Sequence, residues 1–329
     1  MTGARITYHI IGGGIAGLAC AYFLKQRDKN IRTVVYEGAS QLGGRAYSYF
    51  DEGLECRLDN AVHAIIGANK FMARFVKKDE WETTKYFYDV AADNVNDSLY
   101  RNMPHLFKSF CNTRAEEVDS AIKRRILAAV FPFMPSQRKV WFSQQNLSQR
   151  IINVLAGYVD EVHLGCRLQK IAAQFGIAAQ LNFNSLQVDI GAHDKVIIAL
   201  DNLNCGKILN VSPLEHSQIV NIIYRTSQTI FLPKGASFIG VAGGKSDWIF
   251  VGDNLLSAVI SDYVPGKEKL SDLAMKIWSE VDKIRGVNSA FMPPYKAVCC
   301  KNATIRQNAD NNRRRPQNAL TEYPNVFIA

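Results

Sequence analysis

The hydrophobic pattern of the first 45 residues predicts a strand, a helix and a second strand in close succession. Residues 6–11 form a short apolar run, which is typical of a strand buried on both faces. After a glycine-rich turn, apolar positions recur at helical spacing over residues 16–25. Residues 33–36 form a second apolar run, which ends at the acidic residue Glu37. This order predicts a strand–helix–strand unit.

The second half of the chain predicts two kinds of strand. Residues 195–200 have the pattern of a buried parallel strand, and the final run at residues 326–329 has the same apolar character. Between them, short alternating runs separated by Gly and Asp predict an antiparallel sheet over residues 219–226, 237–242, 248–251 and 257–261. Residues 267–284 then place apolar side chains on one face of a predicted helix.

The region between these halves has a mainly helical pattern over residues 68–157. A helix is predicted over residues 121–131, with Pro132 and Pro135 ending it, and a short hairpin precedes the region at residues 47–58. Several aromatic residues of the region could line a hydrophobic tunnel, although aromatic residues at such spacing are more often plain core: Tyr86, Phe87, Tyr88, Phe107 and Phe110.

Composition and charge narrow the class of protein and its partners. With 329 residues, 47% hydrophobic and 21% charged, the chain has globular composition and enough length for two domains. The formal net charge of +9 is compatible with an anionic partner. The basic clusters at residues 123–125 and 313–315 are short, and no aromatic-interleaved basic stripe accompanies them. We interpret them as solvated faces and predict no nucleic-acid partner.

Cysteine and histidine positions predict neither a disulfide framework nor a metal site. The seven cysteines form no C-x-x-C pair and no metal-binding spacing with the six histidines, which indicates a reducing, cytoplasmic compartment and no metal. No secretory signal is expected at the N-terminus. No apolar run approaches the roughly 18 residues of a spanning helix. Any membrane contact is therefore predicted to be peripheral, on the inner face of the cell membrane.

The glycine-rich turn gives the first chemical signal. Gly12, Gly14 and Gly17 form G-x-G-x-x-G between the predicted strand and helix, the context in which this motif binds a dinucleotide. The first glycine permits the tight turn, the second lets the backbone approach a pyrophosphate, and the third lets helix pack on strand. Together with Ile15 and Ala16 at the positive end of the helix, these glycines are predicted to bind a pyrophosphate.

Glu37 completes the predicted nucleotide site. It ends the second strand about 20 residues after the last glycine, where a carboxylate can accept hydrogen bonds from the ribose hydroxyls of an adenosine. A carboxylate at this position disfavours a 2′-phosphate. Glycine-rich turns between strand and helix also occur without a ligand, but the acid in register favours the nucleotide.

Gly43, Gly44 and Arg45 give a second signal directly after this acid. The glycines permit an unusual turn, and the arginine presents a planar fork to phosphate oxygens. Together with G-x-G-x-x-G and Glu37, the segment Leu42-Gly43-Gly44-Arg45 resembles the flavin amine oxidase and phytoene desaturase superfamily. The resemblance implies FAD as the cofactor, with Arg45 beside its phosphates or near the flavin.

Residues 58–67, LDNAVHAIIG, narrow the resemblance. They are similar to the D-N-G-Q-H…G segment of the squalene-associated FAD-dependent desaturases, better described as hydroxysqualene dehydroxylases, with Ala61 and Val62 in place of the glycine and glutamine. The resemblance implies that His63 lies near the isoalloxazine and that Leu168 contacts the adenine through its backbone. A core histidine bonded to a carbonyl is the alternative for His63.

Other positions depart from the same family. Its longer helical insert is expected to be largely absent between residues 131 and 144, which predicts a shortened cap. The sequence stops at Ala329, before the glycine and aspartate that the family uses at the ribityl and phosphate groups, so we expect weakened FAD binding. Cys299 and Cys300 replace a Lys-Glu pair and are interpreted as packing residues.

The sequence therefore predicts an α/β fold in which an FAD-binding Rossmann-type domain of the glutathione-reductase class interleaves with an α+β substrate domain. The predicted cofactor domain comprises residues 1–67, 159–205 and 290–329, and the substrate domain comprises residues 68–158 and 206–289. The resemblance implies an apolar isoprenoid substrate and reductive dehydroxylation of hydroxysqualene to squalene in hopanoid biosynthesis. The alternatives are an amine oxidase, a carotenoid or phytoene desaturase, and a truncated homologue without turnover. No side chain is nominated as catalytic.

Overall fold

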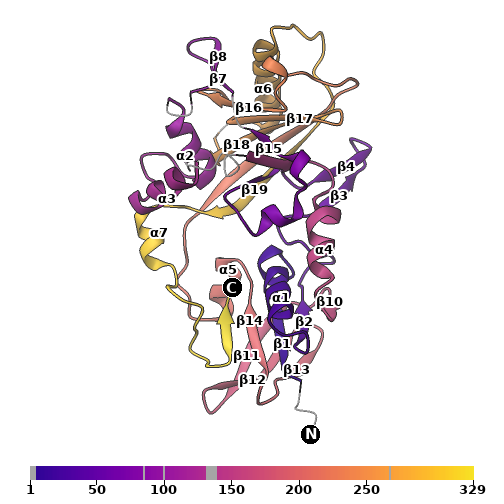
Figure 1. Ribbon diagram of the computed structural model, residues 1–329, viewed down its shortest axis with the longest axis vertical. Coiled ribbons are helices and arrows are strands. Elements are labelled where there is room, and N and C mark those ends of the chain that lie inside the picture. The colour runs from indigo at the N-terminus through magenta and orange to yellow at the C-terminus, as the bar shows by residue number, and fades with distance from the viewer. Residues whose placement is uncertain (1–4, 84–85, 99–100, 131–138, 267) are drawn as a thin grey trace. The chain divides into compact units, whose positions relative to one another are not determined.

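The computed structural model describes residues 5–83, 86–98, 101–130, 139–266 and 268–329 (Figure 1). The chain divides into two compact units, and each is assembled from segments that are separated in sequence. The first unit contains residues 1–48, 146–214 and 314–329, and the second contains residues 49–145 and 215–313.

These units differ in their boundaries from the predicted domains. Residues 49–67 and 290–313 lie in the second unit, whereas residues 146–158 and 206–214 lie in the first. The first difference arises because strands β3 (Ser48–Asp51) and β4 (Cys56–Asp59) form a hairpin whose apolar residues pack on Ile223 and Leu255 of the second unit. The assignment of cofactor and substrate to particular segments stays a prediction.

A five-stranded parallel sheet forms the centre of the first unit. Its strand order is β10-β2-β1-β14-β20, so the N-terminal strand lies in the middle and the C-terminal strand at one edge (Figure 1). The strands are β1 (Thr7–Ile11), β2 (Arg32–Tyr36), β10 (Glu161–His163), β14 (Lys195–Ile198) and β20 (Val326–Ile328). The strands predicted at the start of the chain, near residue 195 and at the C-terminus are therefore confirmed.

Both faces of this parallel sheet are covered. On one face, Ile10 and Val35 pack against Ala21 of helix α1 (Ile15–Arg27). On the other face, Ile11 and Val34 belong to a core that includes the small sheet β11-β12-β13 and helix α5. Burial on both faces explains why these strands have continuous apolar runs. The remaining elements of this unit are β11 (Leu168–Gln174), β12 (Ile177–Phe183), β13 (Gln187–Asp189), α5 (Asn202–Ile208), the π-helical turn η4 (Ser148–Ile152) and α4 (Asn153–Ala156).

A seven-stranded sheet forms the centre of the second unit, in the order β19-β15-β18-β17-β16-β7-β8. Its neighbouring strands are antiparallel except for β16 and β7, which run parallel. The antiparallel sheet predicted from the alternating runs is confirmed. Its strands are β7 (Phe87–Asp89), β8 (Asn94–Asn96), β15 (His216–Arg225), β16 (Phe238–Ala242), β17 (Trp248–Gly252), β18 (Leu255–Tyr263) and β19 (Tyr295–Ile305).

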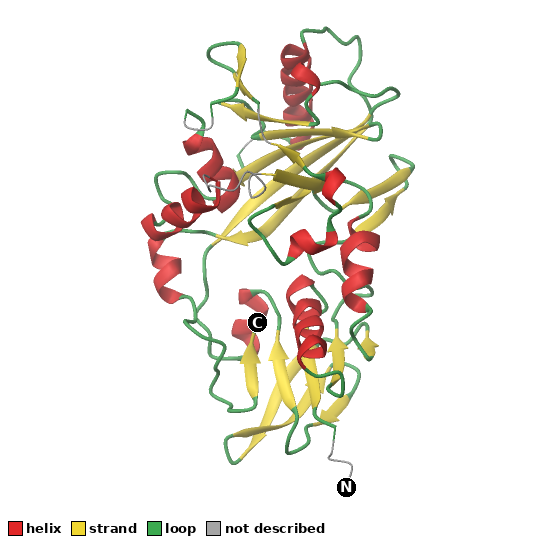
Figure 2. Ribbon diagram, viewed as in Figure 1, coloured by secondary structure: helices red, strands yellow, loops and turns green. Residues whose placement is uncertain are grey.

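Helix α6 (Leu270–Arg285) packs on one face of the seven-stranded sheet (Figure 2). The opposite face carries an aromatic core that it shares with helix α2 (Met103–Cys111) and strands β5 (His63–Ile66) and β9 (Lys139–Ser143). The unit is completed by β6 (Glu82–Thr83), α3 (Ser120–Val130), α7 (Ala309–Arg314) and the short turns η1 (Met72–Phe75), η2 (Lys78–Glu80) and η5 (Pro233–Gly235).

The mainly helical pattern predicted for residues 68–157 is wrong in part, because the described residues of this region also form four strands. Phe87 and Tyr88 show the cause: they are adjacent in β7 and join cores on opposite faces of the sheet. That alternation is the two-residue period of a strand. The strand β7 is too short for this period to stand out from the helical pattern around it. The helix predicted at residues 121–131 is confirmed by α3, whereas Pro132 and Pro135 lie outside the described residues.

Candidate nucleotide-binding site

The predicted glycines lie at the carboxyl ends of the parallel strands of the first unit. The turn after β1 is fixed by the backbone N–H of Gly12, which donates to the carbonyl oxygen of Tyr36 at 2.8 Å. Gly12 has a φ of 108°, and a Cβ there would lie only 2.5 Å from the carbonyl oxygen of Ala199. The first glycine is therefore required by the local fold. In open α/β sheets, ligands bind at this edge of the strands.

The second glycine turn lies against the first. The N–H of Gly43 donates to the carbonyl oxygen of Gly13 at 2.9 Å, and Gly43 forms a parallel bridge with Gly14. Gly44 has a φ of 60°, and a Cβ there would lie 3.2 Å from the Cα of Gly14. The two turns, which are about 30 residues apart in the sequence, thus form one surface made of backbone.

The N-terminus of α1 opens on this surface. Its N-cap residue is Gly14, which offers no side chain to bond the free backbone N–H groups, and the first turn contains no acid. Ile15 is half-buried and Ala16 is exposed. Unpaired N–H groups and the positive end of the helix dipole together attract an anion such as a pyrophosphate.

Gly14 is a glycine that the protein fold itself does not need. Its φ of −76° is accessible to any residue, and an added Cβ would have no neighbour closer than 3.9 Å. The missing side chain therefore leaves free space above the backbone. This open space is the cradle that a pyrophosphate requires, so the residues present fit a dinucleotide.

Glu37 is oriented by backbone groups of the same site. Its Oε2 accepts the N–H of Gly13 at 2.7 Å, and its Oε1 accepts the N–H of Ala39 at 2.8 Å. Each carboxylate oxygen can accept a further hydrogen bond, and the residue is only half-buried. Glu37 is therefore held in position with acceptor capacity left for a ribose hydroxyl.

Arg45 contributes a positive charge at the same edge, close to Asp201. Burial alone would raise the pKa of the Asp201 carboxyl, but hydrogen bonds from Asn204 and Leu203 and the charge of Arg45 hold that pKa below its usual value. Asp201 also caps α5 by accepting backbone N–H groups. We did not predict Asp201 from the sequence, although an acid directly after the apolar strand 195–200 is a visible signal.

Leu168 differs from the other predicted residues because its side chain is buried in the core with Tyr36 and Phe183. Its contact with adenine was predicted for the backbone and stays a prediction. The exposed residue of this segment is the preceding one, Arg167. The backbone N–H of Cys166 donates to the carbonyl oxygen of Glu37 at 2.8 Å, so the segment passes beside the predicted ribose acid.

His63 lies on β5 in the second unit, and its place relative to a flavin stays a prediction. Its Nε2 is 3.0 Å from Oδ1 of Asn60, so a neutral ring donates from Nε2 and keeps Nδ1 as an acceptor. Burial lowers the pKa of His63 to about 4. The alternative interpretation of His63 is a core histidine bonded to a carbonyl. In the structure, the oxygen that His63 contacts belongs to the side-chain amide of Asn60.

Acid is expected to destabilise the protein through His63. Because its pKa is about 4 in the folded chain and 6.5 in model compounds, the unfolded chain takes up the proton first as the pH falls. The free energy of unfolding should fall by up to about 3 kcal/mol between pH 6.5 and 4. Urea unfolding at pH 7 and pH 4.5 should show a smaller loss for His63→Gln than for the wild type. An equal loss in both proteins would contradict the assignment.

The aromatic residues considered for a tunnel do not line one wall. Phe87 and Phe107 belong to the aromatic core beside α2, whereas Tyr86 and Tyr88 pack on the α6 side of the sheet. Phe110 is exposed. The interpretation as plain core therefore accounts for four of the five.

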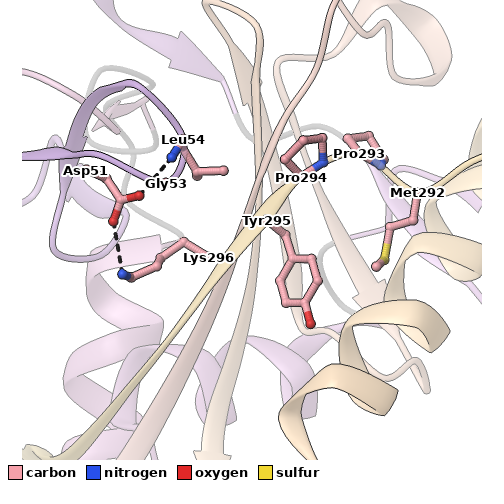
Figure 3. A pocket seen from close by; sticks show the side chains of 8 residues that line it. All are labelled: Asp51, Gly53, Leu54, Met292, Pro293, Pro294, Tyr295 and Lys296. Carbon is pink, nitrogen blue, oxygen red and sulfur yellow. Dashed lines mark hydrogen bonds and ion pairs between the residues drawn. The ribbon is translucent and has the colours of Figure 1, made fainter.

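A separate pocket of about 620 Å³ lies within the second unit (Figure 3). Asp51 and Lys296 form an ion pair at 3.0 Å on one side of it, and Met292 and Tyr295 line the other. Burial opposes ionisation of Asp51, but the hydrogen bonds from Lys296 and from the N–H of Leu54 lower its pKa. None of the predicted cofactor-binding residues lines this pocket.

The described residues contain no group of three or more His, Cys, Asp or Glu side chains that could hold a metal ion. Among the helices of the described ranges, none is both long enough and apolar enough to cross a membrane.

Comparisons with known proteins support the nucleotide site. Residues 10–78 match the family described as the NAD(P)-binding Rossmann-like domain. A coproporphyrinogen III oxidase of Staphylococcus aureus is 38% identical over 68 residues, which cover 21% of this chain and 14% of that protein. The first unit therefore has a Rossmann-like fold of the kind that binds a flavin or a nicotinamide nucleotide.

Three hydroxysqualene dehydroxylases match nearly the whole chain. The hydroxysqualene dehydroxylase of Zymomonas mobilis subsp. mobilis is 25% identical and covers 98% of this chain and 92% of its own length. That of Sinorhizobium fredii is 24% identical, covering 98% and 91%. The first alignment has 388 positions, whereas 98% of this chain is about 322 residues, so about 66 positions face gaps in this chain. Such gaps are expected if the helical insert predicted to be largely absent between residues 131 and 144 is indeed short. Residues 131–138 of this segment lie outside the described residues.

Solved structures share the overall fold. An oxidoreductase from Methanosarcina mazei has a TM-score of 0.69 at 12% identity and covers 98% of this chain and 94% of its own. A putrescine oxidase bound to putrescine has a TM-score of 0.59 at 12% identity, covering 99% and 93%. The predicted resemblance is thus confirmed, since the chain is similar over nearly its whole length to the hydroxysqualene dehydroxylases and shares the fold of these solved oxidoreductases.

Proposed function

We propose that the first unit binds FAD and that the protein uses it to remove the hydroxyl group of hydroxysqualene, yielding squalene. The observation that carries the proposal is the match of three hydroxysqualene dehydroxylases over 98% of the chain, which includes both compact units. The paired glycine turns beside Glu37 support FAD, because one turn suits a pyrophosphate and the acid suits an adenosine ribose.

The proposed reaction is a reductive dehydroxylation. The carbon–oxygen bond breaks, the hydroxyl leaves with a proton as water, and the carbon gains a hydride. Reduced FAD, when bound, supplies the hydride and is oxidised in return. The residues of the first unit would hold the cofactor: Gly14 and the α1 N-terminus at the pyrophosphate, Glu37 at the ribose, and Arg45 beside the phosphates.

His63 is a poor candidate for the proton donor of this reaction. With its pKa lowered to about 4, the imidazole is neutral at pH 7, and its Nε2–H is already donated to Asn60. A general acid works best when its pKa lies near the working pH. His63 would therefore contribute a neutral acceptor at Nδ1, and we assign no proton donor.

The first experiment is a visible absorbance spectrum of the purified protein before and after addition of FAD and removal of the unbound cofactor. Flavin bands near one FAD per chain are the expected result. Protein that stays colourless after FAD is added would overturn the FAD proposal and favour a homologue without turnover.

The second experiment tests the substrate. Protein with reduced FAD is incubated without oxygen with hydroxysqualene, and the products are analysed by mass spectrometry. We expect squalene and reoxidised flavin in equal amounts. The oxidised protein is incubated in parallel with a primary amine and with phytoene. Turnover of either, with none of hydroxysqualene, would replace the proposal with amine oxidation or desaturation. Cytoplasmic location and peripheral membrane contact stay predictions.

A further inference from the structure

A short turn that precedes β11 is attached to the segment that carries Glu37. The N–H of Cys166 donates to the carbonyl oxygen of Glu37 at 2.8 Å, and the N–H of Gly165 donates to the carbonyl oxygen of Ala39 at 2.9 Å. These two bonds lie on either side of Gly38. The turn therefore has a fixed position next to the predicted ribose acid.

Asn184 fixes the same turn from its other side. Its Oδ1 accepts the N–H of Arg167 at 2.7 Å, its Nδ2 donates to the carbonyl oxygen of Gly165 at 3.0 Å, and its own N–H donates to the carbonyl oxygen of Arg167 at 3.1 Å. Gly165 has a φ of 69°, which suits a glycine. Asn184 thus holds the turn by three hydrogen bonds, two of which are to the backbone of Arg167.

The side chain of Arg167 extends over Gly38 at the surface. A Cβ on Gly38 would lie 3.6 Å from the Cβ of Arg167 and 3.7 Å from its Nε, so the arginine covers the place that a side chain would take. Arg167 is exposed. Within the described part of the chain, its guanidinium forms no hydrogen bond or ion pair. The fold therefore places a planar cation beside Glu37, and the described residues provide no hydrogen-bond or ion-pair partner for its guanidinium.

We propose that the guanidinium of Arg167 packs against the adenine ring of the bound dinucleotide. This inference rests on the proposed FAD site, since a ribose bonded to Glu37 brings its own base next to the residues that flank Glu37. A guanidinium is planar and weakly hydrated, and it packs favourably on aromatic rings. The adenine is favoured over a 2′-phosphate as its partner because the carboxylate of Glu37 would repel the phosphate.

The test measures binding of ADP, which carries the adenosine and the pyrophosphate but no flavin, by titration calorimetry. Arg167→Ala should bind ADP about five- to tenfold more weakly than the wild type, and Arg167→Lys should recover only part of the loss because it lacks the planar group. Lys170→Ala, which removes an exposed cation from β11, is the matched control and should bind ADP normally. The thermal midpoints of all variants should agree, because the Arg167 side chain is exposed.

Two results would overturn the proposal for Arg167 alone. One is unchanged ADP affinity in Arg167→Ala while the wild type binds ADP and FAD. The other is adenosine 2′,5′-bisphosphate binding more tightly than ADP through Arg167, which would make the arginine a phosphate ligand. Failure of the wild type to bind either ADP or FAD would instead remove the nucleotide site itself, and the proposal for Arg167 with it.

Discussion

Replacing Gly14 by alanine is expected to abolish tight FAD binding while leaving the folded protein intact. The φ of −76° suits alanine, and the new methyl group would have no neighbour closer than 3.9 Å. It would, however, occupy the open space above the backbone in which a pyrophosphate must approach. We expect the dissociation constant of FAD to rise by roughly 100-fold, because loss of close backbone approach removes several phosphate hydrogen bonds at once.

The measurement is FAD titration followed by flavin fluorescence, with a thermal melt of the same sample without FAD. Gly252→Ala is the matched control, since a Cβ there would have its nearest neighbour at an ordinary 3.6 Å, in the second unit. Equal FAD affinity in Gly14→Ala and the wild type would mean that the pyrophosphate does not approach this backbone. A large fall in melting temperature would mean that Gly14 serves the fold instead.

The nucleotide end of the site could be predicted from sequence because its determinants are local. Gly12 and Gly17 lie close together in the sequence. Each is required locally, because a Cβ on either residue would come too close to a backbone carbonyl oxygen. The acid Glu37 comes at the distance that one helix and one strand impose. Even the contact between Gly14 and Gly43, which are 29 positions apart, follows from two motifs recognisable separately.

Other parts of the site depend on partners that are distant in sequence. Arg167 comes to lie over Gly38 only because Asn184 and the backbone of residues 37–39 hold its turn, and no local pattern marks these bonds. Leu168 is predicted to contact the adenine through its backbone, and this stays a prediction, since the strand turns its side chain into the core.

The second unit was harder to predict for a related reason. The hairpin predicted at residues 47–58 is present at residues 48–59, yet its attachment to the second unit depends on a core shared with Ile223 and Leu255, more than 160 positions later. In β7, three residues are too few to establish a period against a helical background. Short elements in this unit are thus determined by the sheet they join and not by their own sequence.

Replacing Gly17 by alanine is expected to destabilise the first unit, against the trend of helix propensity. Alanine is favoured over glycine in a helix by about 1 kcal/mol. A Cβ at Gly17, however, would lie 2.0 Å from the carbonyl oxygen of Gly12 and 3.1 Å from a methyl group of Ile10, and the first of these is backbone that cannot rotate away. Helix α1 would have to move off β1, at a cost of about 3 kcal/mol or more for such overpacking, so the net effect is a loss of stability.

Hydrogen exchange of the amide groups of β1 and β14 is the suitable measurement, because all four tryptophans lie in the second unit and their fluorescence would not report on the first: Trp81, Trp141, Trp248 and Trp278. Exchange in these two strands should accelerate by roughly 30-fold or more, which is the factor that about 2 kcal/mol of net destabilisation implies. Slower exchange than in the wild type, the outcome that propensity alone predicts, would show that α1 does not pack on β1 through Gly17. Gly14→Ala should keep a stable fold and bind FAD poorly, whereas Gly17→Ala should lose stability even without FAD. The two variants therefore distinguish space that is left open for a ligand from space that is needed for packing.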